Sequence, residues 1–239
     1  MKKNTFKSLA IMAIIALMGT ACGGGSSNPQ NNEMPPDGIL GTFPQKYFNC
    51  VDGINTARAD MAIGTEEEHK TAKAKLEELQ EQLKTMAETE NLASIEIPTE
   101  VATGIPFKVV KPFSIIKAEE KQLTLQGEVE STEAVDQYAA MNYGYIVAYD
   151  KNGKPFTVGQ HGNYAPEGSA LNWAAGTKGT LTIYLSLAAF NIDGLARLDK
   201  LLIVTGKSEE MKQAAAAMSE LQSAAMAETL EKLKKMKKE

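Results

Sequence analysis

The sequence predicts an α+β fold, in which an antiparallel β-sandwich of about seven strands follows a helical pair and precedes a long C-terminal helix that packs on that pair. Apolar residues recur at helical spacing between about 45 and 92, and again from about 208 onward. Between about 94 and 206 the period changes to two. Turn signals separate these short runs and no helical segment alternates with them, which is typical of an antiparallel sandwich.

The start of the chain indicates export. Lys2, Lys3 and Lys7 precede an apolar run over residues 9–18, and small residues follow at 19–21. A basic start, a short apolar run and a small-residue site are the parts of a secretory signal peptide, so residues 1–21 are interpreted as one. As a helix the run spans only about 15 Å, roughly half of the hydrocarbon core of a bilayer, so we do not expect it to cross a membrane.

A cysteine follows the apolar run directly. The segment Gly19-Thr20-Ala21-Cys22 resembles the lipobox of bacterial lipoproteins, in which a dedicated signal peptidase cuts before a lipid-modified cysteine, although Gly19 stands where many lipoboxes carry Leu. The resemblance implies that Cys22 carries acyl chains such as palmitate and holds the protein at a membrane of the bacterial cell envelope. We expect the outer membrane rather than the inner one. In the alternative, an ordinary peptidase cuts after Ala21 and Cys22 is a plain thiol, free to bond to Cys50.

The segment after this cysteine has the composition of a spacer. It is rich in Gly, Ser, Asn and Pro and has no apolar periodicity. Such a segment cannot bury enough apolar surface to offset its ordering entropy, so residues 22–43 are predicted to be the lipidated cysteine and a flexible tether. The remaining cysteine, Cys50, lies on an apolar face, which favours a buried, inert thiol over a reactive one.

The charge excludes one class of partner. The chain has 25 basic and 30 acidic residues, and loss of the signal peptide takes the net charge from −5 to about −8. An acidic protein is soluble and is a poor partner for nucleic acid, so we expect no nucleic-acid binding.

Residues 44–92 are predicted to be an N-terminal helical segment. Tyr47, Val51 and Ile54 fall on one face of a helix over about 45–62. After Gly64, Thr65 and the glutamate three residues later have the spacing of a capping box. The second helix then carries apolar residues at alternating spacings of four and three, the pattern of a short coiled-coil seam: Ala72, Leu76, Leu79, Leu83 and Met86.

Residues 93–206 are predicted to be the β-sandwich domain. The clearest strand is LTLQGEVE, in which apolar and polar residues alternate from Leu123. The run YGYIVAYDKNGKPFTV predicts a hairpin whose turn is Asp150–Gly153, and we favour that turn over a calcium loop. The strand pattern resembles that of the immunoglobulin-like domains of bacterial envelope lipoproteins, without the Cys–Trp–Cys set of antibody domains.

Residues 207–239 are predicted to be the C-terminal helix, which begins near Ser208 and packs beside the Leu76–Leu83 helix. Acids in its first turn and lysines from Lys232 to Lys238 suit the two ends of the helix dipole. Contact of these lysines with anionic lipid is the alternative.

The sequence shows no catalytic constellation, so no catalytic residue, metal ligand or cofactor is predicted. His69 is expected to be solvated and His161 lies in a glycine-flanked segment. No pair of His or Cys residues has the short spacing of a zinc site. Paired carboxylates remain the enzyme alternative, because thirty acids offer many pairs.

The best candidate for a ligand site is a loop predicted from about Phe156 to Lys178. It combines amides, a histidine and aromatic rings, as sugar- or peptide-binding loops do: Gln160, His161, Asn163, Tyr164 and Trp173. In the alternative, Tyr164 and Trp173 fill one end of the core.

These observations favour a lipid-anchored envelope protein that acts as a non-catalytic binding or scaffolding module. Its partners would be a membrane, through Cys22, and an unidentified protein or glycan. Two alternatives stay open. One is a carboxylate-based glycan-processing enzyme, and the other is a structural subunit that assembles through its Leu-, Met- and Ala-rich helices.

Overall fold

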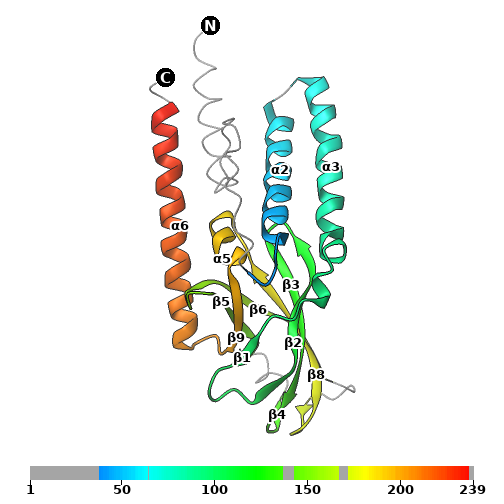
Figure 1. The fold of residues 1–239 in the computed structure, drawn as a ribbon, viewed down its shortest axis with the longest axis vertical. Helices are drawn as coiled ribbons and strands as arrows, with labels where there is room; N and C mark the ends of the chain where they lie inside the picture. Colours follow the sequence, from blue (N-terminus) through cyan, green and yellow to red (C-terminus); the bar gives the residue numbers. More distant parts are fainter. Residues whose placement is uncertain (1–37, 64, 137–142, 167–171, 237–239) are drawn as a thin grey trace.

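The computed structural model describes residues 38–63, 65–136, 143–166 and 172–236. Two antiparallel helices, α2 (Phe43–Ile63) and α3 (Glu66–Thr89), stand on one end of a curved sheet, and a long helix, α6 (Glu209–Met236), runs along its side (Figure 1). In the described ranges, no helix is both long and apolar enough to span a membrane.

The predicted capping box at the start of α3 is confirmed. The Glu68 N–H donates to the hydroxyl of Thr65, and the Glu68 carboxylate accepts from the Thr65 N–H at 2.6 Å. These bonds, the backbone one first, hold the pKa of Glu68 below its ordinary value. Two groups that would otherwise lack partners at the helix start are thereby satisfied.

The sheet has seven strands in the order β1-β9-β5-β6-β8-β3-β2. All neighbouring strands run antiparallel except β1 and β9, which are parallel. The strand bounds are β1 Thr99–Val101, β2 Phe107–Glu119, β3 Gln122–Ser131, β5 Tyr145–Asp150, β6 Pro155–Pro166, β8 Lys178–Ser186 and β9 Leu198–Val204. Two short strands, β4 (Val135–Asp136) and β7 (Asn172–Trp173), pair separately.

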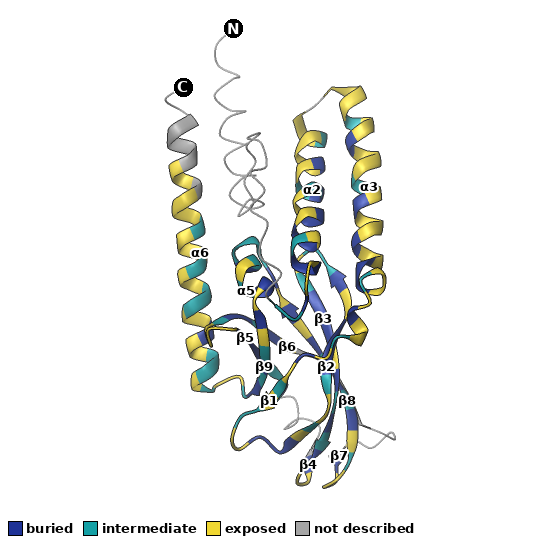
Figure 2. Ribbon diagram, in the orientation of Figure 1, coloured by how far each residue is buried: buried dark blue, intermediate teal, exposed yellow. Residues whose placement is uncertain are grey.

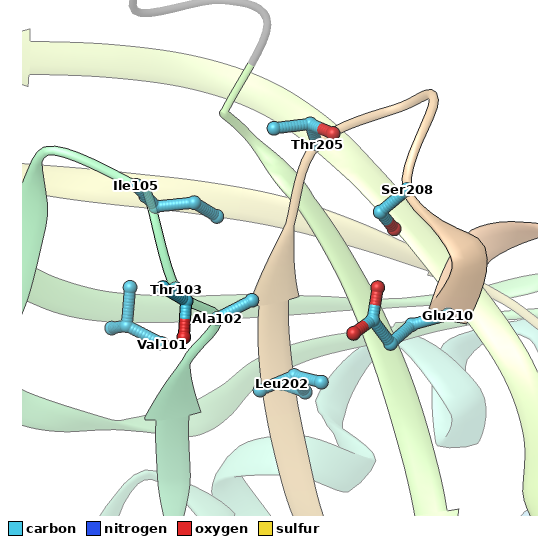
Figure 3. A pocket seen from close by; sticks show the side chains of 8 residues that line it. All are labelled: Val101, Ala102, Thr103, Ile105, Leu202, Thr205, Ser208 and Glu210. Atoms are coloured by element: carbon cyan, nitrogen blue, oxygen red, sulfur yellow. The ribbon is translucent and has the colours of Figure 1, made fainter.

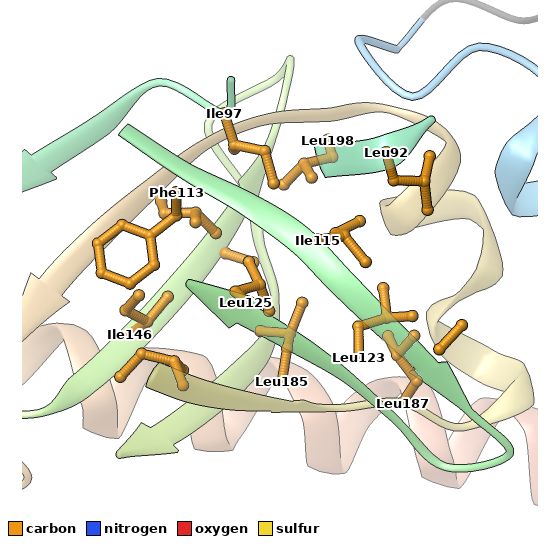
Figure 4. Packing of buried hydrophobic residues seen from close by; sticks show 14 of the residues in the cluster. Leu92, Ile97, Phe113, Ile115, Leu123, Leu125, Ile146, Leu185, Leu187 and Leu198 are labelled. Atoms are coloured by element: carbon orange, nitrogen blue, oxygen red, sulfur yellow. The ribbon is translucent and has the colours of Figure 1, made fainter. Parts of the chain in front are cut away.

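This sheet curls on itself until it is nearly a closed barrel. Just before edge strand β1, the Ile97 N–H donates to the carbonyl of Phe113 on the other edge strand, β2, at 2.8 Å. Apolar side chains from opposite strands fill the interior (Figure 4). The α+β class is confirmed and the immunoglobulin-like sandwich is not. The expectation of a purely antiparallel sheet is wrong, because β1 joins β9 in parallel. Alternation of apolar and polar residues predicts which face of a strand is buried. It does not predict whether that face packs against a second sheet or against the opposite strands of the same curled sheet.

One hydrophobic core joins the helical pair to the sheet. Tyr47 on α2 and Leu83 on α3 belong to the same buried cluster as Ile115 on β2 and Leu201 on β9. Figure 2 shows the buried residues of α2 and α3 continuing into those of the strands.

An ion pair braces this joint between helices and sheet. The Arg58 guanidinium contacts both carboxylate oxygens of Glu120, at 2.5 and 2.8 Å, in the tight turn after β2.

The helix α6 packs on the sheet rather than on the helical pair. Its main contacts are with β6, β5 and the 3₁₀ turn η2 (Ala189–Asn191). Fully buried Ala214 lies with Val147 and Val204 in a second, smaller cluster on the outer face of the sheet. The predicted packing of this helix on α3 is therefore wrong. The reason is that β5 and β9 carry apolar residues on both faces, and α6 buries those of the outer face.

A short helix that the sequence did not predict, α5 (Ile192–Ala196), follows η2. Its start is held by buried Asn191, whose side-chain oxygen accepts from the Ala188 N–H at 2.8 Å and whose amide donates to the Phe156 carbonyl at 2.6 Å. The predicted hairpin between β5 and β6 is confirmed. Its turn is closed by the Asp150 carboxylate, which accepts from the Asn152 and Lys154 N–H groups.

Candidate functional site

Most of the segment predicted as a ligand-binding loop is strand. Gln160, His161, Asn163 and Tyr164 all lie on β6 and pair with residues of β8. Of these four side chains, only that of Gln160 is among those described, and it is exposed. Both β6 and β8 are long strands whose pairing extends to Pro166, which the glycine-rich sequence of this segment did not suggest.

Trp173 fills the core. Its side chain is 1% exposed, and its ring meets that of Phe107 edge-on with centroids 5.3 Å apart. The structure thus gives Trp173 the core-filling position and separates it from exposed Gln160. The residues predicted as one ligand site do not form a single exposed group among the described side chains.

Two other residues noted in the sequence also have defined positions. Cys50 is buried, its Sγ lies 3.3 Å from the Leu79 carbonyl oxygen, and burial raises the pKa of its thiol above the ordinary value. A buried thiol with a raised pKa is unreactive, so Cys50 is expected to be inert. His69 lies half-buried in the first turns of α3. Cys22, the signal peptide and most of the tether lie outside the described residues.

The structure shows a hollow of about 310 Å³ where β1, β9 and α6 meet (Figure 3). Three chain segments line it: the end of β1 with the turn toward β2, the end of β9, and the start of α6. Its lining residues are Val101, Ala102, Thr103, Ile105, Leu202, Thr205, Ser208 and Glu210.

Local backbone bonds position these segments. The Ala102 N–H donates to the Ile203 carbonyl at 3.0 Å, which extends the pairing of β1 with β9. Between β9 and α6, the Ser208 N–H donates to the Thr205 carbonyl, and the Ser208 hydroxyl accepts from the Met211 N–H at 3.2 Å. Ser208 therefore caps the start of α6 and lines the hollow at the same time.

The lining combines an apolar side with hydroxyl groups and one carboxylate. Val101, Ile105 and Leu202 provide the apolar surface, and Glu210 is the only titratable residue of the lining. The hydroxyl groups can donate to and accept from the hydroxyls or amides of a ligand, and the carboxylate accepts from them. Glycoside hydrolysis by the common route needs two carboxyl groups on either side of the bond, and this lining offers one. Over the residues that the structure describes, no group of three or more His, Cys, Asp or Glu side chains is placed to hold a metal ion.

An aromatic row leads away from the hollow across the outer face of the sheet. It consists of Tyr145, Gln160 and Tyr184, which lie opposite one another on the neighbouring strands β5, β6 and β8. Tyr184 is 38% exposed, Gln160 is exposed and Tyr145 is half-buried. A Cβ at Gly206 would lie 2.8 Å from Cε2 of Tyr145, so this ring rests on the loop between Thr205 and Ser208. The row and the hollow therefore adjoin.

Tyr149, four residues after Tyr145 on β5, lies on the same face of the sheet. Burial first, and then the charge of Glu210, raises the pKa of the Tyr149 hydroxyl above its ordinary value. The phenol there is consequently a neutral hydrogen-bonding group at physiological pH.

Sequence reasoning found one residue of this surface, Gln160, and missed the others. The lining residues come from two stretches of sequence about 100 positions apart, 101–105 and 202–210, and each residue is ordinary in its own stretch. The alternation in β5 does show that Tyr145, Val147 and Tyr149 share one face, which is the only local signal of the row.

No model of a known protein family matches this chain, and no curated protein matches it either.

Proposed function

We propose that the chain is a lipid-anchored protein of the bacterial cell envelope that acts as a non-catalytic binding module. Its anchor is Cys22, which follows an apolar run of signal-peptide length and precedes a Gly-, Ser-, Asn- and Pro-rich spacer. Its ligand, a glycan or a protein segment, is bound by the hollow and the adjoining aromatic row.

The observation that carries the binding role is the composition of this surface. An apolar wall with three hydroxyl residues and one carboxylate adjoins two tyrosines that flank an exposed glutamine. Aromatic rings stack on the apolar faces of sugars and peptides, while hydroxyl and amide groups bind their polar edges. The two tyrosines and the glutamine lie on β5, β6 and β8, three neighbouring strands of one nearly closed sheet, so these groups are held in place before a ligand arrives.

Photo-cross-linking in intact cells tests this role. A benzophenone amino acid is placed at Thr103 or Thr205, in the hollow, and at exposed Gln126, on β3, as the matched control. We expect the two hollow positions to give an adduct of the same mass and Gln126 to give none. Equal adducts from all three positions, or none from the two hollow positions, would contradict a ligand site at the hollow.

A further inference from the structure

The carboxylate in the lining of the hollow has no cationic partner among the described residues. Glu210 is half-buried in the first turn of α6, and within that part of the chain it forms no ion pair. The preceding residue differs, because exposed Glu209 pairs with Lys212 at 2.5 Å. Acids in a first turn complement the helix dipole, and Glu209 does so from an exposed position. The dipole alone therefore does not explain why a second acid lines the hollow.

The remaining charged residues of the stretches around the hollow are paired or lie outside its lining. Glu100 on β1 pairs with Lys200 on β9 at 2.8 Å. Lys207, in the loop before α6, is exposed and is not part of the lining, so solvent screens its charge. The charge of Glu210 reaches as far as Tyr149, where it is the second cause, after burial, of the raised pKa of the hydroxyl. The hollow consequently favours a positively charged group.

The rest of the lining suits an alkyl chain. Val101, Ile105 and Leu202 form its apolar wall. Figure 3 shows Thr205 and Ser208 on the same side of the hollow as the carboxylate, across from Val101. The volume of about 310 Å³ is at the lower end of the range for small-molecule sites, roughly 300–1,000 Å³. The hollow therefore admits one side chain or one ring of a larger ligand.

A lysine side chain matches this combination of an apolar wall and a single carboxylate. Its four-carbon stem is apolar, and its ammonium is a compact cation with three N–H donors. The carboxylate and the neighbouring hydroxyls are acceptors for those donors. Arginine carries the same charge on a shorter, three-carbon stem, which leaves more of the wall uncovered. A neutral sugar leaves the carboxylate without a counter-charge, and an acidic ligand is repelled by it.

We propose that the hollow binds a lysine side chain of a partner protein, and that Glu210 is the charge partner of its ammonium. The inference rests on the proposed binding role of the hollow, and it narrows the ligand from a glycan or a protein segment to a protein segment. The aromatic row beside the hollow then contacts the residues that flank this lysine, because tyrosine and glutamine side chains bind peptide groups.

Saturation-transfer NMR on the full-length protein in detergent tests this choice of ligand, with three small probes. They are Nα-acetyl-lysine N-methylamide, the corresponding norleucine compound, which keeps the apolar stem and lacks the ammonium, and N-acetylglucosamine as a neutral sugar. We expect the lysine probe to bind about fivefold more tightly than the other two. High salt should remove this advantage, because a partly exposed ion pair contributes about that factor and salt screens it.

A pair of variants locates the contact. Glu210→Gln removes the charge and keeps the size of the side chain, so it should weaken binding of the lysine probe about fivefold and leave the norleucine probe unchanged. The matched control is Glu209→Gln, at the exposed acid one residue earlier in the same helical turn, and it should leave both probes unchanged. Both variants alter the dipole complement of α6 equally, so their difference reports on the hollow.

The inference is overturned if the wild type does not prefer the lysine probe to the norleucine probe. It is also overturned if this preference survives Glu210→Gln, or if the two variants lose it equally. Tighter binding of N-acetylglucosamine than of the lysine probe would contradict it as well, and would make the ligand a glycan. Each of these results leaves the proposed function standing, because cross-linking from Thr103 and Thr205 in cells tests that function separately.

Discussion

At the scale of single residues, Tyr47 shows how polar groups are accommodated in the core. Its side chain is fully buried, and its hydroxyl donates to the Glu119 carbonyl at 2.6 Å, across the joint between α2 and the sheet. Burial, followed by the charge of Glu120, raises the pKa of Tyr47 above its ordinary value. The folded protein therefore holds this phenol in its neutral form.

Replacing Tyr47 with Phe should cost about 1–2 kcal/mol at neutral pH, because a buried carbonyl loses its donor. Since the folded pKa is raised, the contribution of Tyr47 is fully present below about pH 10, the pKa in the unfolded chain, and is lost as pH rises through the folded pKa. Urea unfolding of both proteins at about pH 8 and about pH 11 measures this. The stability difference between them should shrink at the higher pH, and a constant difference would contradict the account.

At the scale of elements, the attachment of α6 depends on a small contact. Ala214 lies with Val147 and Val204, and the half-buried side chains of Met211, Tyr145 and Tyr149 surround this cluster. A small residue at 214 lets the helix approach the sheet closely. The start of α6 also lines the hollow, so the same contact positions Ser208 and Glu210.

Replacing Ala214 with Glu should detach α6, since a carboxylate would be buried without a partner, at a cost of about 2–4 kcal/mol. The matched control is Ala215→Glu, at an exposed position one residue later. Hydrogen exchange should show the α6 amides exchanging at least tenfold faster in the first variant, with the strands unchanged. Equal exchange in the two variants would mean that α6 is held elsewhere.

Elements were more predictable than their arrangement. The capping box at Thr65 and the hairpin turn at Asp150 depend on residues within a few positions, so local patterns revealed them. The joining of β1 to β9 and the curling of the sheet depend on pairing across about 100 residues, which no local pattern encodes. The hollow could not be predicted from the sequence for the same reason.

At the scale of the whole molecule, one core should couple the helical pair to the far end of the sheet. Leu83 on α3 is buried in the same cluster as Trp173, the only tryptophan of the chain. The cluster is continuous through the interior of the sheet (Figure 4). Unfolding is then a single cooperative transition.

Replacing Leu83 with Ala should cost about 2–5 kcal/mol, because it leaves a cavity in this core. The midpoints of Trp173 fluorescence and of far-ultraviolet circular dichroism should both fall, and by the same amount. Gln82→Ala, at an exposed position beside it, serves as the control. A fluorescence midpoint that stays in place would show that the helical pair unfolds as a separate unit.

The proposed lipid anchor at Cys22 would set the compartment of the protein and the ligands that the hollow can meet. Its direct measurement is incorporation of labelled fatty acid into the protein in growing cells, for the wild type, Cys22→Ala and Cys50→Ala. Since the chain has two cysteines and Cys50 is buried, we expect label in the wild type and in Cys50→Ala and none in Cys22→Ala. Label that persists in Cys22→Ala, or a wild type that takes up none, would contradict it.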